Sequence, residues 1–260
     1  MKDLQLFTDI TRVQTSFARG LPSYHDHAQA QARIARTLAD HLQIAKFRVE
    51  SQNTFENVLE FGCGTGHLTR QLCNAFNIET LHLNDLVPDC ATLAAPLAQS
   101  FVAGPIQDIE LPRHLDLIAS ASTVQWIEDL PGLMHRLTDH LRPGGWLALS
   151  SFAPAHFPEL ATLGSGSAAP SYVTPTDWQA MLPRDIDIHH LAEAKDVMRF
   201  ASPRDVLRHL RATGVNGKAE GRWTRARLNE FEDRYADLFG DGSTVSLTYA
   251  PVWLIARKRG

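Results

Sequence analysis

The sequence is poor in cysteine and has no long apolar run. Its three cysteines, Cys63, Cys73 and Cys90, have no Cys-x-x-Cys spacing, which argues against a zinc site, a redox pair and an iron–sulfur cluster. No apolar stretch approaches the roughly 20 residues of a membrane-spanning helix, and the first residues lack the apolar core of a secretion signal. We therefore expect a cytoplasmic protein without a membrane partner.

An excess of positive charge is also absent. The 25 Lys and Arg residues face 29 Asp and Glu residues, for a net charge of −4. Binding of nucleic acid depends on neutralising phosphates, so this balance argues against it. The pairs His25/His27 and His189/His190 have no third ligand at a recognisable spacing, and we predict no metal site. We expect the chain of 260 residues to form one α/β domain with an insertion and to act as a monomer.

Short apolar segments alternate with helical stretches in the middle of the sequence. The segments between residues 57 and 152 are "NVLEF", "TLHLN", "SFVAG", "LDLIAS" and "GWLALSSF". Such alternation is typical of βαβ units around a parallel sheet. The closing stretch "TVSLTYAPVWLIARK" is rich in β-branched and aromatic residues and suits one last strand, added antiparallel.

Helical segments flank this pattern on both sides. Residues 4–46 have apolar side chains at helical spacing, with one expected break at "GLPSY", residues 20–24. A helix near Thr176–Leu182 and a strand near Ile186–Leu191 are expected to precede a helical insert at Pro203–Phe239. The insert and the N-terminal arm are therefore candidates for elements that cover a site on the sheet.

The stretch "LEFGCGTGHLTRQL" predicts a nucleotide loop. Gly62, Gly64 and Gly66 alternate, whereas the dinucleotide fingerprint would place its third glycine at His67. A phosphate-binding P-loop needs Gly-Lys-Ser or Gly-Lys-Thr, and this stretch contains no lysine. These differences weaken the NAD interpretation and argue more clearly against ATP.

Acidic residues at the strand ends favour a cationic nucleotide, S-adenosylmethionine. Glu60 could hold an ammonium group, and Asp85 follows Gly66 by nineteen positions, where a carboxylate can accept ribose hydroxyl protons. Asp108 could receive the adenine amino group. The alternative is that Glu60 caps a helix and both aspartates are ordinary turn residues. The predicted cofactor-binding residues are Glu60, Gly62, Gly64, Gly66, Asp85, Leu86, Asp108, Ile109 and Ser120.

These residues together resemble the Rossmann-like S-adenosylmethionine-dependent methyltransferases. With "SYHDHAQAQ", "STVQW", "LRPGGWLALSSFAPAHFPEL", "FASPRDVLRHLRATGVNG" and "VSLTYAPVWLIARK", the chain from about Phe17 to Lys258 resembles the malonyl-acyl carrier protein O-methyltransferases of biotin synthesis, the BioC family. It departs from the family pattern at Ala121, where asparagine is expected. The resemblance implies a seven-stranded, mostly parallel sheet with an antiparallel last strand. It also implies a helical arm over residues 1–52, a methyltransferase domain over 53–260, and a helical lid at about 200–240.

The resemblance further implies methylation of the free carboxylate of a malonyl thioester, with S-adenosylhomocysteine as the second product. A carboxylic acid of pKa about 4 is ionised at neutral pH, so no general base is required. Tyr24, Gln125 and Trp126 are the candidates for lining the methyl-transfer site, although Tyr24 could simply pack the arm. The alternatives are a small-molecule carboxyl or natural-product O-methyltransferase and a non-catalytic regulator that binds S-adenosylmethionine.

A basic stretch predicts the carrier-protein surface. Residues 199–227 contain eight basic and two acidic residues, a local charge of +6 on a chain of net −4. Acyl carrier proteins are acidic and would be steered to such a surface. The predicted docking residues are Arg204, Arg208, Arg211, Lys218 and Arg222. One arginine could instead reach inward to hold the malonyl carboxylate, and the alternative for the whole stretch is a solvated helical face.

Overall fold

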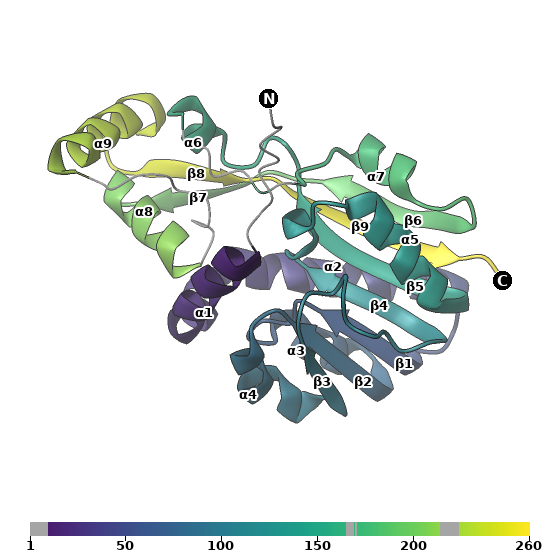
Figure 1. Ribbon diagram of the computed structural model, residues 1–260. Helices are drawn as coiled ribbons and strands as arrows, with labels where there is room; N and C mark the ends of the chain where they lie inside the picture. Colours follow the sequence, from purple (N-terminus) through teal and green to yellow (C-terminus); the bar gives the residue numbers. More distant parts are fainter. Residues whose placement is uncertain (1–9, 165–168, 170, 214–223) are drawn as a thin grey trace, which may run out of the picture.

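The computed structural model describes residues 10–164, 169, 171–213 and 224–260 (Figure 1). Its centre is a seven-stranded sheet of order β3-β2-β1-β4-β5-β9-β6. Its strands are β1 (Thr54–Phe61), β2 (Asn77–Asp85), β3 (Ser100–Ala103), β4 (Leu115–Ala121), β5 (Leu141–Phe152), β6 (Ile186–Glu193) and β9 (Pro251–Lys258). Only β9 among them runs antiparallel to its neighbours, β5 and β6. The predicted α/β fold with a mostly parallel Rossmann-like sheet is confirmed.

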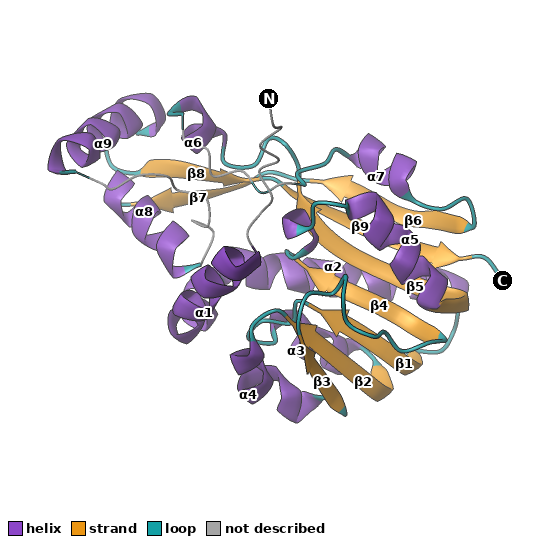
Figure 2. Ribbon diagram, viewed as in Figure 1, coloured by secondary structure: helices purple, strands orange, loops and turns teal. Residues whose placement is uncertain are grey.

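Helices cover both faces of the sheet (Figure 2). One face carries α2 (Gln29–Val49) and α3 (His67–Ala75), and the other carries α5 (Leu130–His140) and α7 (Pro175–Met181). Shorter helical turns are η1 (Pro88–Cys90), α4 (Ala91–Ala94), η2 (Ala95–Leu97), η3 (Val124–Trp126) and α6 (Pro158–Thr162). None of the helices in the described part of the chain is both long and apolar enough to cross a bilayer.

Apolar periodicity explains how these layers pack. On α2, Ile34, Leu38 and Leu42 recur every four residues, lie on one helix face and are almost fully buried against the sheet. The central strand β4 is buried along nearly its whole length, which explains its almost continuous apolar run. Each face of the sheet therefore has its own apolar core, and the ends of the strands remain for polar residues.

The N-terminal arm differs from the prediction. Helix α1 (Ile10–His27) passes through residues 20–24, so the expected break at "GLPSY" is wrong. Proline removes one helical hydrogen bond, but Phe17 and Leu21 pack against the main core, and packing of this kind overrides local propensity. The chain bends instead at Ala28, which is fully buried and has non-helical backbone angles.

The C-terminal stretch also differs. It forms two strands, β8 (Val245–Tyr249) and β9, separated by Ala250. The last strand is antiparallel as predicted, but its predicted extent is wrong, because β8 leaves the main sheet and pairs with β7 (Asp196–Phe200), a strand that the sequence analysis missed. The N–H of Ala194 donates to the carbonyl of Pro251, so β6–β7 and β8–β9 run together as one ribbon.

The helical insert packs on this two-stranded sheet. Its helices are α8 (Pro203–Ala212) and α9 (Arg225–Phe239), beside β7 and β8 (Figure 1). The Tyr235 hydroxyl donates to the carbonyl of Ser246, and His209 Nε2 lies 2.7 Å from the Tyr249 hydroxyl. Burial lowers the pKa of His209 to about 4, so this ring is neutral at pH 7. The helical prediction is confirmed for α8 and α9, while residues 214–223 of the insert lie outside the described part of the chain. The role of the insert as a lid and the domain division at residue 52 stay predictions.

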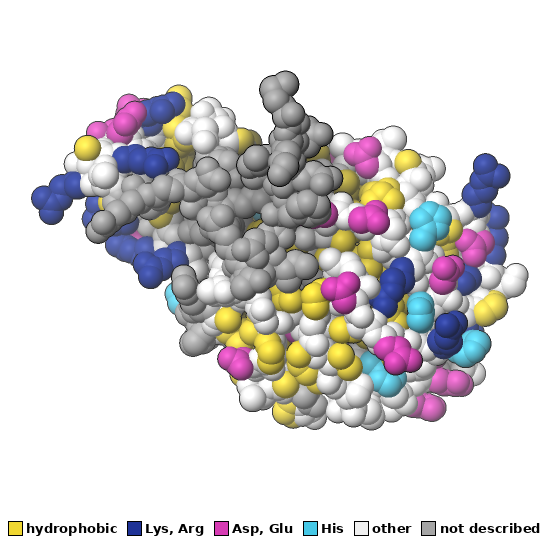
Figure 3. Space-filling view, viewed as in Figure 1, with side chains coloured by type: hydrophobic (Ala, Val, Ile, Leu, Met, Phe, Trp, Pro, Cys, Tyr) yellow, Lys and Arg dark blue, Asp and Glu magenta, His cyan; other side chains and the backbone are white. Residues whose placement is uncertain are grey.

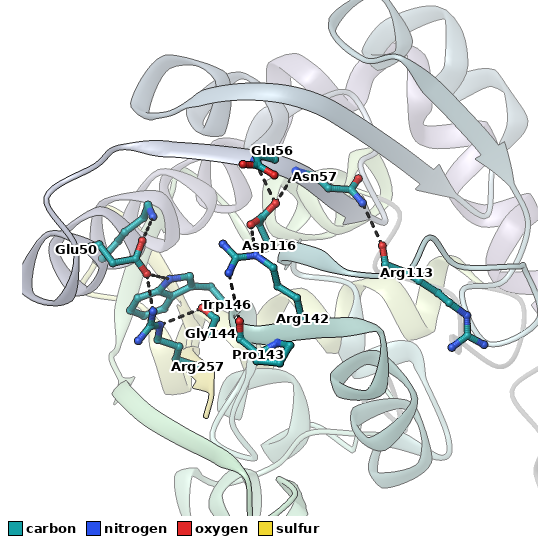
Figure 4. A network of polar contacts seen from close by, with 11 residues as sticks. Glu50, Glu56, Asn57, Arg113, Asp116, Arg142, Pro143, Gly144, Trp146 and Arg257 are labelled. Carbon is teal, nitrogen blue, oxygen red and sulfur yellow. Dashed lines mark hydrogen bonds and ion pairs between the residues drawn. The ribbon is translucent and has the colours of Figure 1, made fainter. Parts of the chain in front are cut away.

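A polar network ties the strands together at the amino end of β4, remote from the strand ends that follow Ala121 (Figure 4). Asp116 is buried and accepts hydrogen bonds from the N–H groups of Glu56 and Asn57, at 3.1 and 2.7 Å, while Arg142 pairs with its other oxygen. This carboxylate thus provides partners for two backbone groups of β1 and one guanidinium.

We expect Asp116→Ala to lower the free energy of unfolding by about 3 kcal/mol, because two backbone N–H groups lose a charged acceptor. Urea denaturation measures this loss. Asp187→Ala is the matched control, since its pair with Arg259 is exposed and adds little to stability. Equal losses in the two variants would show that the network has no special stabilising role.

Candidate active site

A pocket opens where β1, β2 and β4 end, beneath α1. Its walls come from α1, from the turns after these three strands, from the segment after β3, and from η1 and η3. The lining residues are Phe17, Leu21, Tyr24, Phe61, Gly62, Gly64, Asn84, Asp85, Leu86, Val87, Cys90, Gly104, Pro105, Ile106, Gln107, Ala121, Ser122, Thr123, Trp126 and Ile127. The carboxyl ends of parallel strands are the usual ligand position in this kind of sheet.

The glycine turn forms one wall of the pocket. Gly62 and Gly64 have φ angles of +65° and +53°, which residues with a Cβ rarely adopt. A Cβ on Gly62 would lie 2.1 Å from Oγ1 of Thr123, so the turn after β1 is packed directly against the turn after β4. Gly66 also lies in the left-handed region, at the start of α3 and outside the pocket lining.

Asp85 is the last residue of β2 and lines the pocket. Its Oδ2 accepts from the N–H of Gly64 and its Oδ1 from the N–H of Val87, both at 2.8 Å. The residue is 9% exposed and lines the pocket. Burial raises its pKa, and the two backbone N–H groups oppose that rise. The fixed carboxylate lines the pocket and has only acceptor atoms, so it suits neighbouring hydroxyl groups of a ligand.

Glu60 lies behind the glycine turn and is 1% exposed. Burial raises its pKa to about 8, hydrogen bonding from Thr69 opposes this rise, and the nearby charge of Asp85 adds to it. Its Oε2 has no hydrogen-bond partner among the described residues. A buried carboxylate without a cation is unfavourable, and an ammonium group beside it would favour the charged form. Glu60 is outside the pocket lining, so it fits a cationic ligand that reaches behind the turn.

The other predicted cofactor residues lie at different depths. Leu86 lines the pocket, together with Gln107 from the segment after β3. Asp108 is exposed and Ile109 is half-buried, and neither belongs to the lining. Ser120 is fully buried behind the pocket, where its hydroxyl donates to the carbonyl of Phe61 at 2.8 Å. Cofactor contacts of Leu86, Asp108, Ile109 and Ser120 stay predictions.

Helix α1 covers the pocket. Tyr24 lines it from α1, and Trp126 lines it from η3. The rings of Phe17 and Trp126 meet edge to face, with centroids 5.6 Å apart. The side-chain amide of Gln14 donates to the carbonyl of Leu86 at 3.0 Å, which ties α1 to the turn after β2. These contacts join the covering helix to two strand-end turns.

Gln125 lies outside the lining, and its neighbour Ser122 lines the pocket. Gln125 is 4% exposed and its Nε2 donates to the carbonyl of Ser122 at 2.7 Å. Ser122 has a φ angle of +55°, unusual for a residue with a Cβ. The sequence analysis missed Ser122, because nothing in "SASTVQW" distinguishes one serine from another before the backbone is known.

The predicted docking arginines are exposed on α8, but two of them are paired. Arg204 donates to both carboxylate oxygens of Glu232 on α9, at 2.7 and 3.1 Å, and Arg208 pairs with Asp205. Arg211 makes no ion pair with any described residue. Lys218 and Arg222 lie outside the described residues. Figure 3 shows basic and acidic side chains mixed over the region of α8 and α9.

Known methyltransferases are similar to this chain over most of its length. A family model described as a methyltransferase domain matches residues 26–217. The malonyl-acyl carrier protein O-methyltransferase of Chlorobium phaeovibrioides is 36% identical over 251 residues, which cover 94% of each protein. The protein of the same name from Porphyromonas gingivalis is 37% identical over 246 residues, or 93% of each.

Solved structures show the same fold at low identity. A candidate methyltransferase of Bacillus halodurans has a TM-score of 0.62 and 16% identity, covering 86% of this chain and 99% of that one. The cyclase SpnF has a TM-score of 0.53 and 13% identity, covering 86% of this chain and 80% of that one. Since a transferase and a cyclase share the architecture, these two likenesses show the fold alone.

Proposed function

Because the chain belongs to the malonyl-acyl carrier protein O-methyltransferases, within the S-adenosylmethionine-dependent methyltransferases, we propose that it methylates the free carboxylate of a malonyl thioester. The observation that carries this proposal is 36% identity across 94% of both chains. The malonyl methyl ester would lack the charge of the free acid, as a primer for assembling the pimeloyl chain of biotin requires. The chain is thus an O-methyltransferase whose acceptor is a carboxylate.

The residues of the pocket fit S-adenosylmethionine. The glycine turn allows close backbone approach, Asp85 offers two acceptor oxygens for the ribose hydroxyls, and the unpaired Glu60 Oε2 suits the ammonium group. Leu86 and Gln107 would flank the adenine. When bound, S-adenosylmethionine supplies an activated methyl group on a sulfonium. The protein contributes binding and orientation of both reactants.

The part of the pocket lined by Tyr24 and Trp126 suits a methyl acceptor that reacts without a general base. Tyr24 and Trp126 line the pocket, and α1 partly covers it through the contacts of Phe17 and Gln14. A malonyl carboxylate is already ionised at neutral pH. Excluding water strengthens the interactions of this anion and removes a competing nucleophile. We propose that Tyr24 and Trp126 form opposite walls of the methyl-transfer site.

Methyl transfer to purified substrates tests the function. The protein is incubated with methyl-labelled S-adenosylmethionine and either malonyl-carrier protein or malonyl-coenzyme A, and the methyl ester is identified by mass spectrometry. We expect the labelled ester with at least one thioester. Labelled esters of other small carboxylic acids only would show a different acceptor. Cofactor binding without turnover of any carboxylic acid would indicate a regulator.

We also propose that the exposed face of α8 receives the acidic carrier protein. Arg204, Arg208 and Arg211 share this face at i, i+4 and i+7. Glu232 and Asp205 already partner two of them, so Arg211 is the cation with the most freedom to bind an outside carboxylate. Sedimentation of the complex would also test our expectation that the enzyme acts as a monomer.

We expect the triple variant with Arg204, Arg208 and Arg211 changed to glutamate to lower kcat/KM for malonyl-carrier protein at least tenfold. Turnover of malonyl-coenzyme A should stay within twofold, because coenzyme A lacks the acidic protein surface. Arg259→Glu is the control, since it breaks an exposed ion pair of the same kind away from α8. An unchanged rate with the carrier substrate, or equal losses with both substrates, would contradict the docking proposal.

A further inference from the structure

The turn after β4 holds a hydroxyl that the structure leaves without a partner. Ser122 lines the pocket, and its Oγ is buried and makes no hydrogen bond within the described part of the chain. Its backbone has a φ of +55°, a conformation that is strained for any residue with a Cβ. Such strain persists only where the surroundings enforce it, and it concentrates at functional sites.

The surroundings that enforce this conformation are identifiable. The N–H of Ser122 donates to the carbonyl of Ser150 at 3.1 Å on β5, and the carbonyl of Ser122 accepts from Gln125 Nε2 at 2.7 Å. Both backbone groups of Ser122 are therefore occupied, whereas its side chain is free. The turn fixes the place of this hydroxyl, whose oxygen is buried in the wall of the pocket.

We propose that the hydroxyl of Ser122 donates a hydrogen bond to the carboxylate of the methyl acceptor and so selects an acyl chain that ends in an acid. A serine hydroxyl has one proton to donate, and a carboxylate has only acceptor atoms. Hydrogen bonds to a charged group are roughly twice as strong as neutral ones. One carboxylate oxygen would be held by Ser122, leaving the other oriented for attack. This inference rests on the carboxyl methylation proposed above.

The position of Ser122 favours the acceptor over the cofactor. In the function proposed above, Asp85 on β2 and Glu60 on β1 serve the ribose and ammonium groups of the cofactor. Ser122 lies instead on the turn that leads to Trp126, and Tyr24 of the covering helix lines the same pocket. The carboxylate of the methionine part of the cofactor has the same chemistry, so the experiment must separate these two anions.

Gln125 is the positioning residue of this arrangement. It does not line the pocket, and its amide holds the carbonyl of Ser122. A buried amide of this kind fixes the backbone of the turn and, through it, the direction of the Ser122 hydroxyl. Gln125 therefore acts on the acceptor through Ser122.

Binding to the complex of the protein with S-adenosylhomocysteine tests the inference. The titrants are malonyl-carrier protein and acetyl-carrier protein, which differ by the terminal carboxylate. We expect Ser122→Ala to weaken malonyl binding about 10- to 100-fold. Acetyl binding and the Kd for S-adenosylmethionine should stay within twofold. A comparable loss of S-adenosylmethionine affinity would assign the hydroxyl to the cofactor and overturn the inference.

A second substitution at Ser122 separates the effect of the lost hydroxyl from the effect of the strained backbone. Ser122→Gly relieves the left-handed strain and also removes the hydroxyl, so it should lose as much malonyl affinity as Ser122→Ala. Full affinity in the glycine variant would overturn the inference. Ser151→Ala is the matched control, because Ser151 is a buried serine of β5 whose Oγ also has no partner among the described residues and which does not line the pocket. It should bind every ligand as the wild type does.

The preference for malonyl-carrier protein over acetyl-carrier protein also tests the role of Gln125. Gln125→Ala should reduce the ratio of malonyl to acetyl affinity, and adding Ser122→Ala should reduce it no further. Losses that add in the double variant would show that Gln125 does not act through Ser122. If the wild type binds both carrier proteins equally, no carboxylate subsite exists and the inference is wrong. If the variants change malonyl binding as expected but no methyl ester forms, the proposed function is wrong.

Discussion

Replacing Asp85 by alanine is expected to weaken S-adenosylmethionine binding at least 100-fold. The variant loses two acceptor oxygens for the ribose and leaves the N–H groups of Gly64 and Val87 without the acceptor they have at 2.8 Å. Each hydrogen bond to a charged group contributes about 1.5 to 3 kcal/mol, so two of them amount to about 3 kcal/mol or more. Isothermal titration measures the Kd.

Asp85→Asn is the informative companion, because it keeps the shape and one acceptor oxygen. Its amide nitrogen would face a backbone N–H, so we expect an affinity between those of the wild type and Asp85→Ala. Asp89→Ala controls for general charge loss, since Asp89 is an exposed acid on η1 outside the pocket lining. A Kd within threefold of wild type in Asp85→Ala would show that the ribose is held elsewhere.

Replacing Gly62 by alanine is expected to lower the free energy of unfolding by about 2 to 4 kcal/mol and to abolish cofactor binding. The new Cβ would lie 2.1 Å from Oγ1 and 2.5 Å from Cγ2 of Thr123, a branched side chain that has little room to move. Overpacking costs about 1 to 3 kcal/mol, and the left-handed backbone adds about 1 kcal/mol. The turns after β1 and β4 would have to separate.

Gly242→Ala provides the matched control for this change. Gly242 has a φ of +89°, and a Cβ there would meet no atom within 4 Å. Its substitution should therefore cost only the backbone strain of about 1 kcal/mol. Urea denaturation of both variants gives the comparison. Similar losses would show that strain alone, and not the contact with Thr123, makes glycine necessary at position 62.

The strands of the sheet, the glycine turn and Asp85 can be predicted from the sequence because each depends on a local sequence pattern. Alternating apolar segments indicate the strands, and glycines at alternate positions indicate a close turn after one of them. Asp85 is recognisable because it ends the next strand, and parallel strands bring their carboxyl ends to one edge. In each case the decisive residues are less than about two dozen positions apart.

The remaining features depend on contacts between distant parts of the chain. Gly62 meets Thr123 across 61 positions, and the left-handed turn at Ser122 depends on Ser150 in another strand. The basic stretch ends at Arg227 and the acids of α9 follow it, and only the packing of α8 on α9 brings Glu232 to Arg204. The path of α1 through residues 20–24 is decided by packing, which local propensity does not contain.

The ribbon made by β6–β7 and β8–β9 has a mechanical consequence. Its two strands leave the main sheet side by side, and the hydrogen bond from Ala194 to Pro251 joins them at the point of departure. Because α8 and α9 pack on β7 and β8, they are attached to the main sheet by two paired strands instead of one, so we expect these helices and their arginine face to move as one body.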